Sequence, residues 1–556
     1  MTRVVAVDGT PAVPGVAYAP AIWASPRPEV DGRGPRIAET ERDAEKSRFR
    51  EAAAVVAARL KERGAVAGGV AAEVLSANAA LAEDRGWLGA VDKLIGAGAP
   101  AIEAAVGATE QFTTLFTQMG GLMAERVTDL RDVRDRVVAE FAGLSEPGVP
   151  APSHPSVLCA EDLAPADTAG LDPTRIVGIV TVLGGPTSHT AIIARQLGIP
   201  CVVAARDLDQ VRSDQLVLLD GAAGTLVVDP DPDEARSAVQ AATDEAARVA
   251  AWAGPGRTSD GAPISVLANV QDGAGARAAA ETAAEGIGLF RTELCFLDRD
   301  TEPTVEEQAE IYGEVLEAFA RHKVVIRTLD AGSDKPLRFV DHRSEANPAL
   351  GVRGIRIAAQ EPGILERQLD AIALAADRTG NRPSVMAPMV ATVAEAASFA
   401  DLVRARDLVP GAMIEVPAAA LHADRLLRHV DFLSIGTNDL TQYTMAVDRM
   451  SSELAALTDP WQPAVLTLVA TAADAGERSS KPVGVCGEAA ADPLLACVLA
   501  GMGVTSLSCA AAAVSRVGAK LSATTKAACE RAAEAALSAD GPDGARSAAL
   551  EALSGT

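Results

Sequence analysis

The second half of the chain alternates short apolar strands with helical segments, and this repeat constrains the fold more than any other feature. Eight strand candidates follow one another: ISVLAN (264–269), GIGLFR (286–291), VVIRTLD (324–330), SVMAPMV (384–390), AMIEVP (412–417), FLSIGTND (432–439), PVGVCGE (482–488) and TSLSCA (505–510). Two of the intervening helices open with a capping box, Thr304 with Glu307 and Thr392 with Glu395. Eight strand–helix units in roughly 300 residues predict a (β/α)8 barrel. A doubly wound open sheet is the alternative, and the number of units favours closure.

The first half of the chain predicts an α/β domain that is interrupted by a helical segment. RIVGIVTVL and CVVAA predict buried strands on either side of the helix TSHTAIIARQLG, and QLVLLDGAAGTLVVDP predicts a hairpin that turns at Asp220 to Gly224. The predicted domains are an α/β domain (1–23 and 145–230), a helical subdomain (24–144), a helical linker (231–253) and the barrel (254–556). Beyond about residue 522 we expect one helix and then a loose end.

Composition excludes several classes of protein. The net charge of -25 argues against binding to nucleic acid. The first residues lack the pattern of a signal peptide, and no run of 18 or more apolar residues predicts insertion in a membrane. The 7 cysteines form no CxxC pair, as is typical of reduced thiols. These features predict a cytoplasmic enzyme or binding protein.

Polar side chains end several of the predicted barrel strands. Taken singly, an arginine after a strand is usually solvated or salt-bridged. In a (β/α)8 barrel, however, all strand ends share one face, and that face carries the active site. The residues at strand ends are Arg291, Arg327, Glu415, Asn438, Asp439 and Cys486, and those in the following loops are Arg353 and Arg449.

This set of side chains suits a small polyanion and a divalent metal. Glu415 and Asp439 are hard oxygen ligands of the kind that Mg²⁺ prefers. Arginines bind phosphate and carboxylate groups with two hydrogen bonds each. Cys486 is placed where a thiol could donate a proton, although a buried small apolar side chain is the simpler interpretation of its position.

His189 is a second candidate centre. It follows two glycines, and Thr187 or Ser188 can cap a helix whose first turn contains the imidazole. A helix N-terminus stabilises a phosphoryl group, although a structural histidine is the simpler interpretation of the position alone. The other five histidines have no such setting. The residues expected to face the core on the opposite side of this helix are Ile192, Ile193 and Leu197.

Taken together, these motifs resemble enzyme I of the bacterial phosphoenolpyruvate-dependent sugar phosphotransferase system. The similarity runs from about residue 7 to about 520. The motifs that carry it are GGPTSHTAIIAR (184–195), GIGLFRTEL (286–294), RTLDAGSDK (327–335), NPALGVRGIRI (347–357), IEVPAAA (414–420), SIGTNDLTQYTMAVDR (434–449) and VCGEAA (485–490). The departures from the commonest family pattern are Pro186, Ser333 and Val352, and none is a reacting group.

The resemblance implies a role for each site residue. It implies that His189 is phosphorylated on Nε2 and that Cys486 protonates the enolate carbon to release pyruvate. By this resemblance, phosphoenolpyruvate is held by Arg291, Arg327, Asn438, Asp439 and Arg449. Arg353 and Lys335 are expected to line the site. The expected Mg²⁺ ligands are Glu415 and Asp439.

The resemblance also implies partners. The helical subdomain (24–144) would receive the histidine phosphocarrier protein, and the barrel (254–556) would form a homodimer. The domain that carries His189 would have to swing between the barrel and this partner.

Two other functions are consistent with parts of the pattern. GG-x-TSHTA also occurs in pyruvate phosphate dikinase and phosphoenolpyruvate synthase, but those enzymes need an ATP-binding domain ahead of the histidine. Fewer than 190 residues precede His189, without a glycine-rich nucleotide loop. A non-catalytic scaffold would be expected to have lost at least one of His189, Asp439 and Cys486, and all three are present.

Overall fold

The chain divides into two compact units, residues 1–245 and 246–556, in its computed structural model. The structure describes residues 5–25, 28, 34–66, 69–119, 121–150, 152–163, 167, 171–185, 188–297, 299–332, 336–340, 345–449 and 451–554. Each unit has its own sheet and its own buried apolar core. The boundary between the units falls within α8 (Pro232–Ala251), so the four-part division made from the sequence stays a prediction.

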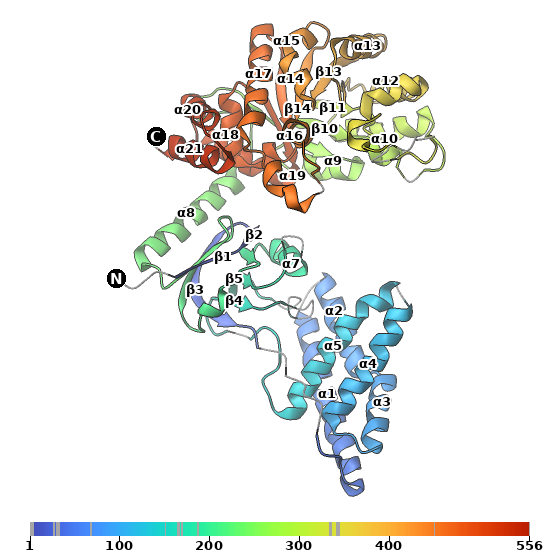
Figure 1. The fold of residues 1–556 in the computed structure, drawn as a ribbon, viewed down its shortest axis with the longest axis vertical. Helices are drawn as coiled ribbons and strands as arrows, with labels where there is room; N and C mark the ends of the chain where they lie inside the picture. Colours follow the sequence, from blue (N-terminus) through green and yellow to red (C-terminus); the bar gives the residue numbers. More distant parts are fainter. Residues whose placement is uncertain are drawn as a thin grey trace. The chain divides into compact units, whose positions relative to one another are not determined.

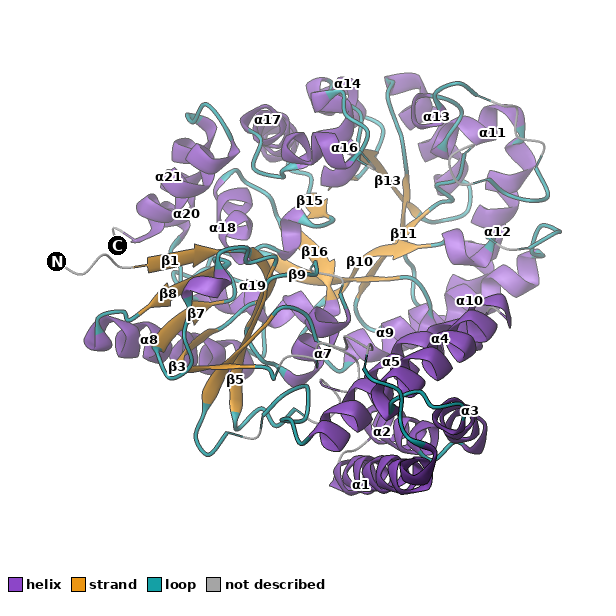
Figure 2. Cartoon of the chain, turned by 60° about the horizontal axis from the view of Figure 1, so that its bottom comes forward, coloured by secondary structure: helices purple, strands orange, loops and turns teal. Residues whose placement is uncertain are grey.

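The second unit is a closed barrel of eight parallel strands, paired in chain order from β9 to β16, and β16 pairs back onto β9 (Figure 2). The predicted barrel is therefore confirmed, and the open sheet is excluded. The strands are β9 (Ser265–Val270), β10 (Gly286–Arg291), β11 (Lys323–Arg327), β12 (Ser384–Ala387), β13 (Val409–Ile414), β14 (Phe432–Gly436), β15 (Val483–Cys486) and β16 (Ser506–Ala510).

Helices surround the barrel strands, as Figure 1 shows. Both predicted capping boxes are present, at the start of α10 and of α13. The helices of this unit are α9 (Gly273–Ala280), α10 (Val305–Ala318), α11 (Ile357–Gln360), α12 (Pro362–Thr379), α13 (Val393–Arg404), α14 (Pro417–Leu421), α15 (Ala423–Leu426), α16 (Thr437–Met445), α17 (Pro463–Ser479), α18 (Pro493–Gly501), α19 (Ala511–Ser522), α20 (Lys526–Leu537) and α21 (Pro542–Ser554).

The C-terminal tail differs from the sequence-based expectation. It forms two helices, α20 and α21, where one helix and a loose end were expected. Pro542 opens α21, and a proline is well tolerated in a first helical turn. Ala545 and Ala549 are buried on α21, whose many contacts with α20 cover the alanine-rich faces of both helices. Such a short alanine-rich helix gains most of its stability from this packing.

The first unit contains an eight-stranded sheet in the order β1-β8-β7-β3-β4-β5-β6-β2. The predicted hairpin is confirmed as β7 and β8, whose turn is held by two backbone N–H groups that donate to Asp220 Oδ1 at 2.9 Å. The strands are β1 (Val5–Asp8), β2 (Thr10–Val13), β3 (Val16–Trp23), β4 (Ser156–Ala160), β5 (Ile176–Thr181), β6 (Cys201–Val203), β7 (Leu216–Asp220) and β8 (Thr225–Val228). In the described part of this unit, α7 (His189–Leu197) precedes β6.

Five helices between β3 and β4 form a bundle with a separate apolar core around Phe49 and Trp87 (Figure 2). They are α1 (Arg42–Val66), α2 (Gly69–Ala82), α3 (Arg85–Gly96), α4 (Ala101–Met119) and α5 (Gly121–Ala142). Among the described ranges, no helix of either unit combines the length and the apolar character needed to cross a membrane.

We expect Gly501→Ala to lower the free energy of unfolding by about 1–3 kcal/mol. A Cβ at Gly501 would lie 2.0 Å from the carbonyl oxygen of Cys529, because α18 and α20 pack closely there. Gly313→Ala in α10 is the matched control, since no described atom lies within 4 Å of its Cβ position, and it should be neutral or stabilising by up to about 1 kcal/mol. Denaturant titration followed by circular dichroism measures both variants, and equal midpoints would contradict this packing.

Candidate active site

A pocket of about 500 Å³ opens at the C-terminal ends of the barrel strands. Seven of the predicted site residues line it: Arg291, Arg327, Glu415, Asn438, Asp439, Arg449 and Cys486. Barrel closure therefore brings together side chains that lie up to 195 positions apart in the sequence (Arg291 to Cys486, 486 − 291).

The strand ends aim these side chains at one another. Arg291, Arg327 and Cys486 are the last residues of their strands, and Glu415 follows β13 directly. Asn438 and Asp439 differ from the expectation, because they lie in the first turn of α16 and not in a strand.

The reason for that difference is a close approach at Gly436, where β14 ends. A Cβ on Gly436 would lie 2.7 Å from Cγ of Glu415, so a side chain would clash with the carboxylate. The glycine lets the chain enter α16 at once beside Glu415. Asn438 and Asp439 are thereby brought to the same pocket.

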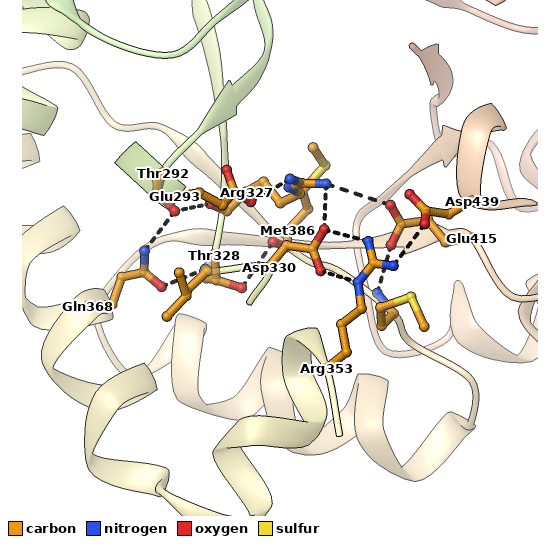
Figure 3. A network of polar contacts seen from close by, with 12 residues as sticks. Thr292, Glu293, Arg327, Thr328, Asp330, Arg353, Gln368, Met386, Glu415 and Asp439 are labelled. Carbon is orange, nitrogen blue, oxygen red and sulfur yellow. Dashed lines mark hydrogen bonds and ion pairs between the residues drawn. The ribbon is translucent and has the colours of Figure 1, made fainter. Parts of the chain in front are cut away.

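Arg327 is paired with three carboxylates, as Figure 3 shows. Its Nη2 donates to Glu293, and its Nη1 lies 3.2 Å from Asp330 Oδ2 and 3.8 Å from Glu415 Oε1. Its Nε is buried without a hydrogen-bond partner among the described residues. One cation therefore offsets part of the charge of a cluster of buried acids.

Arg353 lies between two carboxylates, those of Asp330 and Asp439 (Figure 3). Its Nε and Nη2 donate to the two oxygens of Asp330 at 3.1 and 3.0 Å, and its Nη1 lies 3.1 Å from Asp439 Oδ1. The guanidinium is buried, with 1% of the residue exposed. Arg353 is not among the pocket-lining residues in the described part of the chain, so its contact with a substrate stays a prediction.

Sequence reasoning missed Glu293 and Asp330, which are essential to this charge balance. Both are buried acids that line the pocket. They follow the strand-ending residues Arg291 and Arg327 by two and three positions. Asp330 is the last residue of the predicted strand 324–330, so the rule that selected the arginines could have found it, whereas Glu293 would have required extending that rule into the loop after Arg291.

A buried polar chain fixes the loops after β10 and β11 (Figure 3). Thr292 Oγ1 donates to the carbonyl oxygen of Arg327 at 2.9 Å, and Gln368 Nε2 donates to Thr292 Oγ1 at 3.0 Å. The Oε1 atom of the same glutamine accepts from the backbone N–H of Leu329 at 2.9 Å. Gln368, on α12, thus connects the two loops that carry Glu293 and Asp330.

Glu415 is a carboxylate of the site whose pKa is raised well above its ordinary value. Burial, followed by the charges of Asp330 and Asp439, raises the pKa of Glu415 to about 8, while Arg327 and the N–H of Met389 act in the opposite direction. Its Oε2 accepts from that N–H at 2.8 Å. A further cation beside Glu415 would therefore be stabilised by the negative charge of these carboxylates that the arginines leave uncompensated.

The donor set fits a divalent metal that is completed by substrate and water. Glu415 and Asp439 supply hard oxygen atoms, and Asp439 Oδ1 is buried with an ion pair to Arg353 but no aligned hydrogen bond in the described structure. No group of three or more His, Cys, Asp or Glu side chains in the described ranges is arranged to hold a metal. Mg²⁺ needs no such cage, because one or two carboxylates and substrate oxygens are sufficient.

The Cys486 thiol is buried at the base of the pocket, with 2% of the residue exposed. Its Sγ donates to the carbonyl oxygen of Ile435 at 3.4 Å and accepts from Ser434 Oγ at 3.5 Å. Burial raises the pKa of Cys486, and the hydrogen bond from Ser434 opposes this shift. The sulfur therefore carries a proton at neutral pH.

Two other predicted residues belong to the first unit or lie outside the described residues. His189 is the first residue of α7, and Ser188 caps this helix by accepting from the N–H of Ala191 at 3.3 Å, as predicted. The expected apolar face of α7 is wrong in part, because Ile192 and Leu197 are exposed and Ala191 and Ala194 are buried in their place. Lys335, with Pro186 and Ser333, lies outside the described residues.

We expect Glu415→Gln to become more stable relative to the wild type as pH rises from 5 to 9 in the presence of a chelator. The folded state holds the Glu415 proton up to a pKa of about 8, compared with an ordinary value of 4.5. The folded state therefore binds more protons than the unfolded state between these values, and stability falls as pH rises through this window. The lost stability is on the order of a few kcal/mol.

Thermal unfolding at several pH values measures this difference. Glu488→Gln, which changes an exposed carboxylate of the same pocket, is the control. A melting-temperature difference between wild type and Glu415→Gln that does not change with pH would contradict the shift.

Three family models of PEP-utilising enzymes match the chain. They are the N-terminal model (residues 8–126), the mobile-domain model (152–224) and the PEP-binding-domain model (246–526). A phosphoenolpyruvate-protein phosphotransferase of Streptomyces coelicolor is 50% identical over 92% of this chain and 92% of its own. Another, of Haloferax volcanii, is 42% identical over 81% of each chain. A solution structure of an enzyme I protein matches 42% of this chain and 98% of its own, at 30% identity and a TM-score of 0.39.

The matched regions include both the helix that begins at His189 and the barrel that carries the charged pocket. On this extent of identity and coverage, the chain belongs to the phosphoenolpyruvate-protein phosphotransferases, the enzyme I family of PEP-utilising enzymes.

Proposed function

We propose that this chain transfers the phosphoryl group of phosphoenolpyruvate to His189, releases pyruvate, and passes the group on to the histidine phosphocarrier protein of a sugar phosphotransferase system. The observation that carries the proposal is the pocket at the barrel mouth. There Arg291, Arg327 and Arg449 lie with Glu415 and Asp439 beside a protonated thiol. A small substrate with phosphate, carboxylate and enol groups matches each of these features.

The arginines would bind and orient this substrate. Arg291 ends β10 at the pocket, and the partly exposed Arg449 lies with its Nη1 3.5 Å from Asp439 Oδ2. Guanidinium groups at fixed positions can hold phosphate and carboxylate oxygens and stabilise charge that develops during transfer. Asn438 adds a neutral donor on the same wall. Phosphoryl transfer depends mainly on such positioning and charge stabilisation.

Glu415 and Asp439 would hold the Mg²⁺ ion. When bound, this ion would neutralise phosphate and enolate charge as a Lewis acid. Arg353 would keep Asp439 in place, because its guanidinium is fixed by both oxygens of Asp330.

Two different side chains would take part in the two chemical steps, phosphoryl transfer and protonation of the enolate. A ring nitrogen of His189 would attack phosphorus while the bond from phosphorus to the enol oxygen breaks. The resulting enolate carbon would take the proton of the Cys486 thiol, giving pyruvate and a thiolate. His189 opens α7, and the N-terminal end of a helix favours a phosphorylated ring.

The finer features of this proposal come from the family. The helical bundle α1–α5 would receive the phosphocarrier protein, the barrel would form a homodimer, and the enzyme would act in the cytoplasm. The two relatives named above are phosphoenolpyruvate-protein phosphotransferases, which favours this proposal over the dikinase alternative.

We expect His189→Ala to abolish labelling of the protein by [³²P]phosphoenolpyruvate and Mg²⁺, because it removes the proposed acceptor nitrogen. His154→Ala, at an exposed position before β4, is the matched control and should be labelled like the wild type. Gel autoradiography after acid- and base-quenching measures the label, since phosphohistidine survives only in base. Strong base-stable labelling of His189→Ala would reject the site.

We expect Cys486→Ala to retain phosphoenolpyruvate binding and to slow pyruvate release by about 10²–10⁴-fold, because it removes the general acid but no binding group. Cys509→Ala, at a buried position of β16 outside the pocket, is the control for loss of a buried thiol. Calorimetric titration measures binding, and rapid-quench analysis measures pyruvate. Release at the wild-type rate from Cys486→Ala would exclude the acid role.

A further inference from the structure

The interior of the barrel combines bulky apolar residues with a set of small residues, and Val325 and Phe432 of the bulky set also line the cavity beside the small ones. Leu289, Val325, Met386, Met413 and Phe432 pack against Cys486 in one apolar cluster. A (β/α)8 barrel interior is normally filled by such bulky residues all round. Here, a second set of interior positions is occupied by glycine and serine: Gly288, Ser434, Gly484, Ser506 and Ser508.

A larger residue at Gly288 or Gly484 would occupy the space that now holds a serine hydroxyl. A Cβ on Gly288 would lie 2.4 Å from Ser508 Oγ, and one on Gly484 would lie 2.5 Å from Ser506 Oγ. The serine hydroxyls thus occupy the space that two missing side chains leave. A column of polar groups results in the interior of an otherwise apolar barrel.

This column encloses a small cavity that reaches the N-terminal end of the barrel. About 20 Å³ is open to the centre of a water molecule, which is sufficient for one water. Three hydroxyls, those of Ser434, Ser506 and Ser508, line the cavity together with Lys323, an exposed residue at the start of β11. These are the two to four polar partners that a buried water requires.

Ser434 connects this cavity to the active site. It lines the cavity, whereas Cys486 lines the substrate pocket on the other side. The Ser434 hydroxyl donates to Cys486 Sγ at 3.5 Å, so its proton already points at the sulfur. Its oxygen can at the same time accept a hydrogen bond from a water molecule in the cavity.

We propose that Ser434 and the water-sized cavity beneath it return a proton to Cys486 from the N-terminal end of the barrel. This inference rests on the proposed function, in which Cys486 gives up a proton for each pyruvate formed. Ser434 O–H then transfers its proton to the thiolate and takes one from water in the cavity, which takes one from solvent beside Lys323. One solvent proton is consumed for each pyruvate, and no other bond changes.

The physical advantage of this route is that it avoids the substrate pocket. Cys486 is 2% exposed, and the pocket above it is the place where substrate and the attacking imidazole must meet. A proton that arrives from below reaches the sulfur while the pocket is filled. The thiol can therefore exchange with solvent during the lifetime of the bound enolate.

An isotope-exchange ratio tests this route on the full-length protein. The enzyme is incubated in D₂O with Mg²⁺, phosphoenolpyruvate and [¹⁴C]pyruvate. Two rates are then measured: carbon exchange between the two compounds, and deuterium entry into the pyruvate methyl group. Deuterium enters without carbon exchange only when Cys486 exchanges its proton before the enolate takes it back. The ratio is therefore insensitive to a variant that merely slows the chemistry.

We expect the ratio of deuterium entry to carbon exchange to fall severalfold in Ser434→Ala, which breaks the link, and in Ser506→Val, which fills the cavity. Thr505→Val removes the hydroxyl next along the chain, which donates to the carbonyl oxygen of Val483 and does not line the cavity, and it should leave the ratio unchanged.

An unchanged ratio in Ser434→Ala would overturn the route, whether or not Ser506→Val folds, because exchange would then occur through the pocket. A ratio that falls equally in Thr505→Val would overturn it too. Absence of carbon exchange in the wild type would instead reject the proposed function itself.

Discussion

Closure of eight parallel strands into one barrel is the constraint on which the rest of this structure depends. Because every strand runs in the same direction, all strand ends meet at one rim. Arg291, Arg327 and Cys486 end three of these strands, so they converge although they are far apart in the sequence. An open sheet with the same strand sequences would distribute these residues along an edge. Closure concentrates them around one pocket.

That concentration of charge has to be balanced, and the structure balances it with arginines. Arg327 and Arg353 are both buried, and between them they contact Glu293, Asp330, Glu415 and Asp439. Breaking one partner of such a buried network leaves an uncompensated charge and costs several kcal/mol. Burial and the neighbouring charges of Asp330 and Asp439 together raise the pKa of Glu415, although Arg327 opposes this shift. The negative charge of these carboxylates is what a divalent cation would complement.

The barrel also separates two environments around Cys486. Above the sulfur lies a wide, charged pocket, and below it lie apolar side chains and a narrow column of serines and glycines. A proton donor needs contact with the reacting carbon on one side and with a source of protons on another. In the proposed mechanism, the hydrogen bond from Ser434 would provide the second contact, while burial raises the pKa of the thiol.

The sequence alone determined the barrel, the hairpin at Asp220, the capping boxes and seven residues that line the pocket, because periodicity and strand-end chemistry are local properties. Only the tertiary structure decided the positions of Glu293 and Asp330 and the burial of Arg353 between two acids. It also decided the exposure of Ile192 and the second C-terminal helix. These depend on tertiary packing, such as that of α21 on α20 and of Arg353 between Asp330 and Asp439, which the periodicity of a single segment does not record.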